Sequence, residues 1–222
     1  MIDWQEDKKK QIADKVENNM TIQMIDSKDS DFAEDTWDSL MVGQIVKVNQ
    51  NQRFPADLVL LKSSNPNGIA YVETISLDGE TNLKHKSAIR DMQDAILSPQ
   101  DASTINGHIY CDYPDDHLHN FDGLMTIKVK NSESSYKYSL DYNQLLLRGT
   151  SLKTTHWVYG IVVYTGSETK IKQNEAILNA EKPPAKLSRM QKLTNSFVLY
   201  LLAIQIALSC VLAEMDYKFD TQ

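Results

Sequence analysis

The chain has 222 residues, of which 41% are hydrophobic and 24% are charged, so it can bury one substantial core and carry an appendage. Its formal net charge of −7 leaves no basic surplus to neutralise a nucleic-acid backbone, and we expect no nucleic-acid partner. The two cysteines, Cys111 and Cys210, provide no disulfide framework, which fits a reducing compartment. The first residues lack the basic-then-apolar order of a secretory signal peptide, and we expect no such signal.

Residues 1–38 are expected to form an N-terminal tether. It is predicted to be helical over residues 4–17, where Trp4, Ile12 and Val16 follow one row along a helix. Three lysines at residues 8–10 interrupt this row. Such a run is typical of a solvated helix face, and contact with anionic lipid head groups is the alternative.

Residues 39–167 are expected to form a β-rich domain. Residues 40–48 predict a turn followed by a strand, and the continuous apolar run at residues 58–61 is typical of a buried strand. Asp57 stands at the start of that run. As a catalyst it would need an adjacent base or metal, which the sequence does not show, so we expect it to tie a loop by accepting backbone N–H bonds.

The strongest candidate for a functional site is YVETISLDGETNLK at residues 71–84. Apolar residues alternate in and just before its first half, at Ile69, Tyr71, Ile75 and Leu77. This pattern predicts a half-buried strand up to Leu77, followed by a turn in which Gly79 can take a positive φ and Asp78 can hydrogen-bond nearby backbone. Glu80 then carries a carboxylate on a short tip, where it could orient a water or accept its proton. An exposed hairpin turn with a solvated glutamate is the competing interpretation.

The middle of the chain predicts one short helix and many short strands. The helix is expected over residues 85–94, and the strands lie at residues 105–110, 124–130, 136–140, 144–147 and 157–164. Short strands with few helices between them favour an antiparallel sandwich or jelly roll over alternating βαβ units. The predicted fold class is therefore mainly β with flanking helices.

One polar loop in this region invites a metal-site hypothesis. Its candidate ligands are His108, Cys111, Asp112, Asp115, Asp116, His117 and His119. Zinc sites require ligand pairs at short, regular spacing on a closed scaffold, whereas these residues are scattered over an irregular segment. We therefore expect a polar loop that binds no metal.

The C-terminal part is predicted to be helical and apolar. A jointed helical linker is expected over residues 168–196, because a helix that begins near Glu168 must stop at Pro183 and Pro184. Residues 197–214 are predicted to be a transmembrane helix, with a buried core helix as the alternative. The charges flanking this span are Lys182, Lys186, Arg189 and Lys192 before it and Glu214, Asp216 and Asp220 after it. By the positive-inside rule the β-rich domain is cytosolic and residues 215–222 form an exoplasmic tail.

Several motifs resemble those of the type IV P-type ATPases, the phospholipid flippases. They are FPADLVLLKSS at residues 54–64, YVET at 71–74, LDGETNLK at 77–84, QLLLRGT at 144–150, WVYGIVVYTG at 157–166 and ETK at 168–170. They follow the family's order over nearly the whole chain. In the cation-pumping relatives the tip reads T-G-E-S, so D-G-E-T is the lipid-transporting version.

The resemblance implies an actuator domain, a distorted jelly roll, that leads into the third membrane helix of an ATP-driven pump. It implies that Glu80 orients and deprotonates the water that hydrolyses an aspartyl phosphate, with Gly79 permitting close approach and Asp78 and Thr81 shaping the tip. ATP and Mg²⁺ are implied for the complete pump, and no cofactor or metal is expected in this segment. The implied partners are the other pump domains, a phospholipid moved toward the cytosolic leaflet, the membrane and, as an open alternative, an accessory subunit.

The chain has no D-K-T-G phosphorylation motif and no nucleotide-binding domain, so this segment alone is expected to be inactive. The alternative function is a truncated, non-catalytic β-domain, anchored in a membrane, that binds or regulates a partner.

Overall fold

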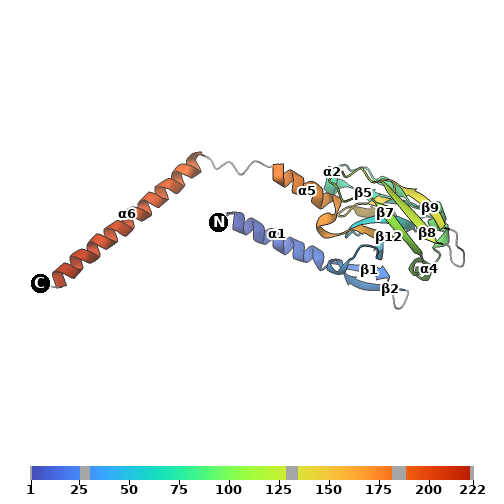
Figure 1. Cartoon of the computed structure of the whole chain (residues 1–222), viewed down its shortest axis with the longest axis horizontal. Helices are drawn as coiled ribbons and strands as arrows, with labels where there is room; N and C mark the ends of the chain where they lie inside the picture. Colours follow the sequence, from blue (N-terminus) through green and yellow to red (C-terminus); the bar gives the residue numbers. More distant parts are fainter. Residues whose placement is uncertain (1, 26–30, 129–134, 182–188, 221–222) are drawn as a thin grey trace. The chain divides into compact units, whose positions relative to one another are not determined.

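The computed structural model describes residues 2–25, 31–128, 135–181 and 189–220 (Figure 1). It divides into two compact units, Met1–Leu178 and Asn179–Gln222. The helices are α1 (Ile2–Asn18), α2 (Ile75–Asp78), α3 (Arg90–Ala95), α4 (Pro99–Ser103), α5 (Lys170–Glu181) and α6 (Arg189–Asp220), with 3₁₀ turns at Trp37–Ser39 and Gly166–Glu168. The first unit is mainly β with flanking helices, as the sequence predicts.

The largest sheet has six strands, and all its pairings are antiparallel. In spatial order they are β10 (Leu145–Leu146), β4 (Asp57–Ser63), β12 (Trp157–Tyr164), β3 (Ile45–Asn49), β1 (Thr21–Ile25) and β2 (Phe32–Thr36). The strand β12 is the last strand in the sequence but lies between β3 and β4 in the sheet, so segments far apart in the sequence meet at its centre.

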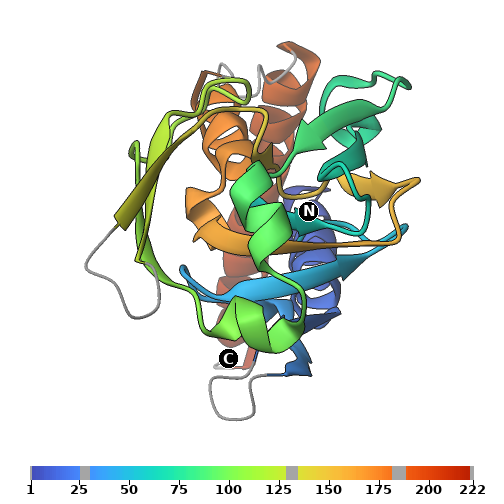
Figure 2. The same ribbon diagram turned by 90° about the vertical axis from the view of Figure 1, so that its right-hand side faces the viewer.

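Two three-stranded antiparallel sheets complete the first unit. One contains β11 (Ser151–Lys153), β5 (Ile69–Glu73) and β6 (Lys84–Ser87), and the other contains β7 (Asn106–Cys111), β8 (Gly123–Lys128) and β9 (Ser135–Leu140). Figure 2 shows the β7–β8–β9 sheet curving along one side of the domain, with the short helices α3 and α4 nearby.

The strand β4 is buried on both faces, which explains its continuous apolar sequence. Leu58 and Leu60 pack into one hydrophobic cluster, whereas Val59 and Leu61 pack into a second cluster on the opposite face. Gly160 of β12 lets β12 and β4 approach closely, because a Cβ at this position would lie 3.0 Å from the Leu58 Cβ. The core therefore surrounds the β4–β12 pair.

Two local predictions around the candidate site are wrong in part. The strand does not continue to Leu77, because β5 ends at Glu73 and the chain enters the single turn of α2. The amides of Leu77 and Asp78 both donate to the Thr74 carbonyl, so a local turn replaces the strand pairing. The helix predicted over residues 85–94 is confirmed only in its second half, as α3, because residues 84–87 pair with β5 as the strand β6.

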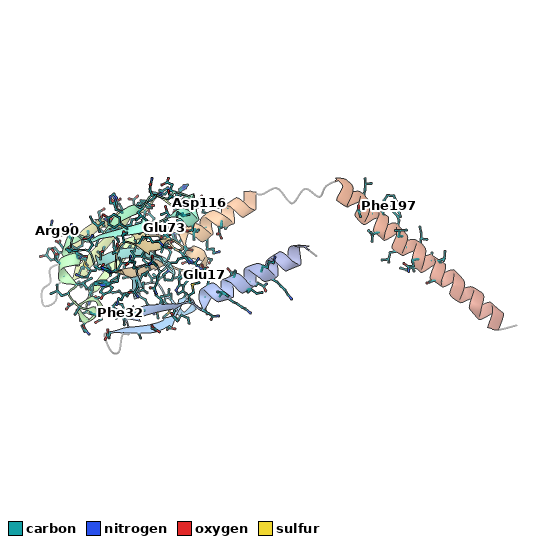
Figure 3. The ribbon with its side chains drawn as sticks, turned by 180° about the vertical axis from the view of Figure 1, so that it is seen from behind. Glu17, Phe32, Glu73, Arg90, Asp116 and Phe197 are labelled. Carbon is teal, nitrogen blue, oxygen red and sulfur yellow. The ribbon has the colours of Figure 1, made fainter. Side chains whose placement is uncertain are left out.

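The second unit contains α6, whose described apolar side chains are exposed, such as Phe197 at 67% (Figure 3). Within the described residues, no helix reaches the length and apolarity that a membrane crossing requires, so the span predicted over residues 197–214 is not confirmed. The joint predicted at Pro183 and Pro184 lies outside the described residues, as do Lys182 and Lys186.

Candidate active site

The candidate tip is a one-turn helix between two paired strands. The strand β5 leads into α2, and the chain returns as β6, with Val72 opposite Lys84. Gly79 ends α2 in the left-handed conformation, with φ at 72°, and its amide donates to the Ile75 carbonyl at 3.1 Å. A Cβ here would meet nothing within 4 Å, so the backbone conformation, rather than crowding, favours glycine. The predicted positive φ is confirmed.

Asp78 fixes the conformation of this turn. Its Oδ1 accepts the Glu80 amide at 2.9 Å, as the sequence predicts, and both its carboxylate oxygens lie 3.0 Å from the donating Thr74 hydroxyl. The Lys84 ammonium donates to Oδ2 at 2.6 Å. This last hydrogen bond is the main reason that the pKa of Asp78 falls to about 2, so the carboxylate is ionised at neutral pH.

Glu80 extends from this anchored backbone toward solvent, with 58% of its side chain exposed. Its Oε2 lies 3.3 Å from the Lys84 Nζ, and Thr81 beside it is also exposed. Lys84 ends the LDGETNLK motif, and its contact with the tip becomes visible only in the structure. The signal that could have found it is the spacing of four residues between a glutamate and a lysine.

Asp57, the first residue of β4, is fully buried and ties two distant segments together. Its carboxylate accepts the backbone amides of Arg148 at 2.8 Å and of Lys170 at 2.7 Å, which confirms the predicted structural role. Burial raises the pKa of Asp57 to about 6, and the two amides oppose this change. The start of α5 is thereby attached to the start of β4.

Arg148 contacts the end of α1 and the segment that precedes α5, and the residue after it contacts α2. Its guanidinium lies 3.2 Å from a Glu17 carboxylate oxygen near the end of α1 (Figure 3) and donates to the Gly166 carbonyl, also at 3.2 Å. The next residue, Gly149, accepts the Ser76 hydroxyl of α2 at 3.0 Å. One short loop therefore contacts α1, the segment before α5 and the tip.

The acidic and histidine-rich loop packs against α5. The Lys170 side chain is 2% exposed, and its ammonium pairs with the Asp115 carboxylate and donates to the His117 carbonyl at 3.2 Å. The Asn174 side chain donates to the Asp116 carbonyl at 3.2 Å. Among the described residues, no group of three His, Cys, Asp or Glu side chains is arranged to hold a metal ion.

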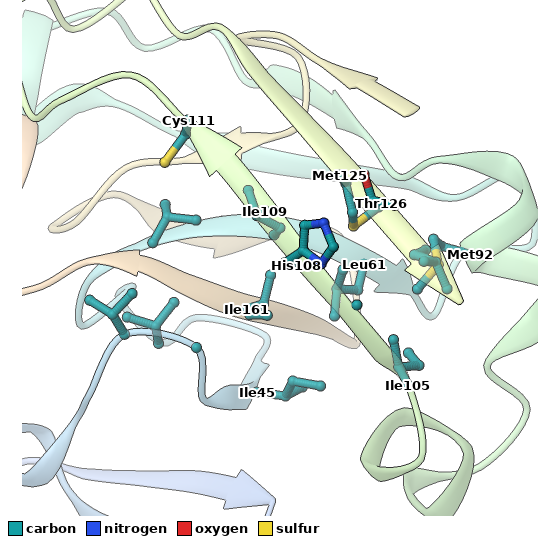
Figure 4. Close-up of a pocket in the computed structure, with 16 residues that line it drawn as sticks. Ile45, Leu61, Met92, Ile105, His108, Ile109, Cys111, Met125, Thr126 and Ile161 are labelled. Atoms are coloured by element: carbon teal, nitrogen blue, oxygen red, sulfur yellow. The ribbon is translucent and has the colours of Figure 1, made fainter. Parts of the chain in front are cut away.

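A cavity of about 280 Å³ lies elsewhere in the domain (Figure 4). Its lining is mainly apolar, with Ile45, Leu61 and Ile161 from the large sheet facing Ile109 and Met125 from β7 and β8. His108 and Cys111, two of the candidate metal ligands that the sequence offered, also line it, whereas no residue of the tip does. The structure thus separates the cavity from the acidic tip.

Comparison with known proteins relates the chain to lipid-transporting ATPases, although no family model matches it. It is 42% identical to Phospholipid-transporting ATPase C887.12 of Schizosaccharomyces pombe over 80% of this chain and 13% of the relative. It is 36% identical to Phospholipid-transporting ATPase 1 of Arabidopsis thaliana over 95% of this chain and 17% of the relative. For Phospholipid-transporting ATPase DRS2 of Saccharomyces cerevisiae, the identity is 34% over 91% of this chain and 14% of the relative.

The chain spans about one sixth or less of the length of these curated relatives. A solved zinc-transporting PIB-type ATPase in the E2.Pi state aligns with 84% of this chain and 21% of its own, at 14% identity and a TM-score of 0.43, which is too low to assign the fold. The similarity to the phospholipid-transporting ATPases extends over 80–95% of this chain, at 34–42% identity. The chain therefore belongs to the type IV P-type ATPases, as one segment of such a protein.

Proposed function

We propose that this segment is the actuator module of an ATP-driven phospholipid flippase and that Glu80 directs water onto the phosphorylated aspartate of another domain. The observation that carries this proposal is the solvent-facing Glu80 carboxylate on a backbone that Asp78 holds in place. The relatives are phospholipid-transporting ATPases by name, which supports an ATP-driven pump with a phospholipid substrate.

The chemical step is hydrolysis of an acyl phosphate. The Glu80 carboxylate accepts a proton from water as the water oxygen bonds to phosphorus, and the bond between phosphorus and the aspartate oxygen breaks. The products are inorganic phosphate and a free aspartate carboxylate. Gly79 presents no side chain toward solvent at the tip, so nothing at this position obstructs the approach of the tip to a phosphorylated partner.

The geometry suits a tip that must approach and leave another domain without changing its own shape. The Glu80 amide is held by Asp78, which Thr74 and Lys84 hold in turn, so the backbone is fixed while the Glu80 side chain stays accessible. Preorganised groups of this kind lose little conformational freedom when they meet a reacting centre. Asp78 and Thr81 shape the tip and are assigned no proton transfer.

The attachment of α5 would transmit movement of the domain to the rest of the pump. The buried contacts of Lys170 with Asp57 and Asp115 bind the first residue of α5 to the β-domain, so the two must move together at this point. Exposed apolar side chains at positions between Phe197 and Leu208 of α6, and the basic residues before this segment, support the proposal that residues 197–214 are the third membrane helix, with the β-domain cytosolic. We also assign the β-domain to the distorted jelly-roll fold of actuator domains.

In the complete pump, domains other than this one would bind ATP and Mg²⁺. An accessory subunit is a further partner proposed for the complete pump. This chain contains no D-K-T-G motif, so by itself it should form no phosphoenzyme.

A chimera tests the role of Glu80. The matching segment of the S. pombe relative is replaced by this chain, and phosphoenzyme is formed from labelled ATP and then chased with unlabelled ATP. Glu80→Gln keeps the size of the side chain but removes the base, so phosphoenzyme should still form and its loss should slow by about 10²–10⁴-fold. The matched control is Glu73→Gln, on the same hairpin but paired with Lys153 at 3.5 Å, which should decay at the parental rate. Fast loss of phosphoenzyme in the Glu80→Gln chimera would refute the assignment.

A further inference from the structure

Lys84 forms ion pairs with both carboxylates of the tip, those of Asp78 and Glu80. Of the ion pairs within the described residues, both that involve tip carboxylates belong to Lys84, with its Nζ 2.6 Å from Asp78 Oδ2 and 3.3 Å from Glu80 Oε2. Lys84 is the first residue of β6, opposite Val72 of β5, so its backbone is fixed by strand pairing. The strand pairing therefore fixes the position from which the Lys84 side chain reaches the tip.

The contact of Lys84 with Asp78 is one of several that hold the turn, whereas its contact with Glu80 holds only the Glu80 side chain. Asp78 already accepts the Thr74 hydroxyl and the Glu80 amide, both of which hold the turn without Lys84. The Glu80 side chain, by contrast, is exposed, and Lys84 is the ion-pair partner that the structure shows for it. Loss of Lys84 would thus release the Glu80 carboxylate while two of the supports of the turn remain.

The proposed reaction brings the Glu80 carboxylate close to a phosphoryl group that is itself negatively charged. Like charges repel, and the repulsion grows when an interface excludes water. An ammonium beside the carboxylate offsets this repulsion, and interactions of this kind between exposed groups weaken as salt screens them. The pKa of Lys84 is raised by its hydrogen bond to Asp78, so the positive charge is present throughout the neutral range.

We propose that Lys84 is a positioning residue of the dephosphorylation step, which holds the Glu80 carboxylate and supplies the positive charge that lets it approach the phosphorylated aspartate. This inference rests on the proposed function of Glu80. Lys84 acts through Glu80 and transfers no proton itself.

The test uses the same chimera and measures the decay of preformed phosphoenzyme. Lys84→Met should leave phosphoenzyme formation intact and slow its decay by about 10–100-fold, less than the 10²–10⁴-fold expected when the base itself is removed, because the Glu80 carboxylate is still present. Lys84→Arg, which keeps the charge, should restore most of the parental rate. Lys153→Met is the matched control, because Lys153 forms the Glu73 ion pair on the same sheet, and it should decay like the parent.

Salt dependence separates a charge effect from a purely structural one. Added potassium chloride should speed decay in the Lys84→Met chimera, because screening reduces the repulsion that the lysine otherwise offsets. A defect in Lys84→Met that salt does not change and that Lys84→Arg does not rescue would show that Lys84 only braces the turn. Parental decay in Lys84→Met would overturn the inference as well.

A double variant distinguishes failure of this inference from failure of the proposed function. In the Glu80→Gln background, Lys84→Met should have no further effect, since the group it positions is absent. Additive effects would contradict action through Glu80. Normal decay in Glu80→Gln alone would refute the proposed function, whereas slow decay there with fast decay in Lys84→Met would refute only the role of Lys84.

The contact itself can be measured without activity in the 222-residue chain. Because the Lys84 hydrogen bond is the main reason that the pKa of Asp78 is about 2, Lys84→Met should move it toward 3.8 in an NMR titration of the carboxyl carbon. An unchanged Asp78 titration would show that Lys84 does not occupy this position in solution.

Discussion

Lys86 is a buried lysine whose replacement should change how stability depends on pH. Its side chain lies on β6 two residues beyond Lys84, and only 3% of the residue is exposed. The ammonium donates to the Tyr142 carbonyl at 2.7 Å and lies 3.2 Å from the centre of the Tyr142 ring. Burial lowers the pKa of Lys86 to about 7, with repulsion from Lys84 adding to the effect and Asp141 opposing it.

The sign of the effect follows from proton binding in the two states. The unfolded chain takes up a proton at this lysine near pH 10.5, whereas the folded chain does so only near pH 7. Between these values the unfolded state binds more protons at Lys86, so the contribution of Lys86 to stability falls as pH is lowered from 10.5 to 7 and is level below that. At 1.36 kcal/mol for each pKa unit, this one group should lower the unfolding free energy by about 2 kcal/mol between pH 9 and pH 7.

Lys86→Met should remove this dependence. Methionine is unbranched and can follow the same path through the core, while the lost hydrogen bond to the Tyr142 carbonyl costs about 1 kcal/mol at every pH. Relative to the parent, the variant should therefore gain about 2 kcal/mol on going from pH 9 to pH 7. Urea unfolding of the 222-residue chain, followed by circular dichroism at both pH values, measures this difference.

Lys137→Met provides the control, because Lys137 is an exposed residue of β9. It should stay within about 0.5 kcal/mol of the parent at both pH values. An equal pH dependence in the parent and in Lys86→Met would refute the reasoning. It would mean that the Tyr142 ring and carbonyl stabilise the ammonium as well as water does.

Two further substitutions test the core. Burial raises the pKa of Asp57 from 3.8 to about 6, so its stabilising contribution is present below 3.8 and is lost as pH rises through 6. Asp57→Asn should therefore gain about 2 kcal/mol relative to the parent between pH 4 and pH 7, and urea titrations with no relative change would contradict this. Gly160→Ala places a Cβ 3.0 Å from the Leu58 Cβ and should destabilise the chain by about 1–3 kcal/mol. An unchanged urea midpoint would show that β4 and β12 separate easily.

The parts of the fold that could be predicted are those with a local cause. The strand β12 is confirmed at residues 157–164, because a run of β-branched and aromatic residues favours a strand and Thr165 and Gly166 end it. The positive φ of Gly79 and the hydrogen bond from the Glu80 amide to Asp78 were likewise predictable, since both arise within three residues. Asp57 could be assigned a structural role because no reactive partner adjoins it in the sequence.

Other elements had no local signal. The strands β1, β2 and β11 were not predicted, because each has only three to five residues. β1 and β2 pair with each other and β1 also pairs with β3, whereas β11 pairs with the distant strand β5. The alternation up to Leu77 was misleading because Thr74 begins a turn there. Residues 84–87 resemble a helix in composition, and only their pairing with β5 makes them a strand.

What the sequence determined by itself is the D-G-E-T motif with its turn, the buried strand β4 and the membership of a family of ATPases, because these depend on neighbouring residues or on motifs in order. Only the tertiary structure could decide which partners hold the tip and its tethers in place. Glu17 meets Arg148, and Asp57 meets the Lys170 amide, across more than a hundred residues. No sequence period encodes contacts of that range, because they form only when sheet pairing and burial bring distant segments together.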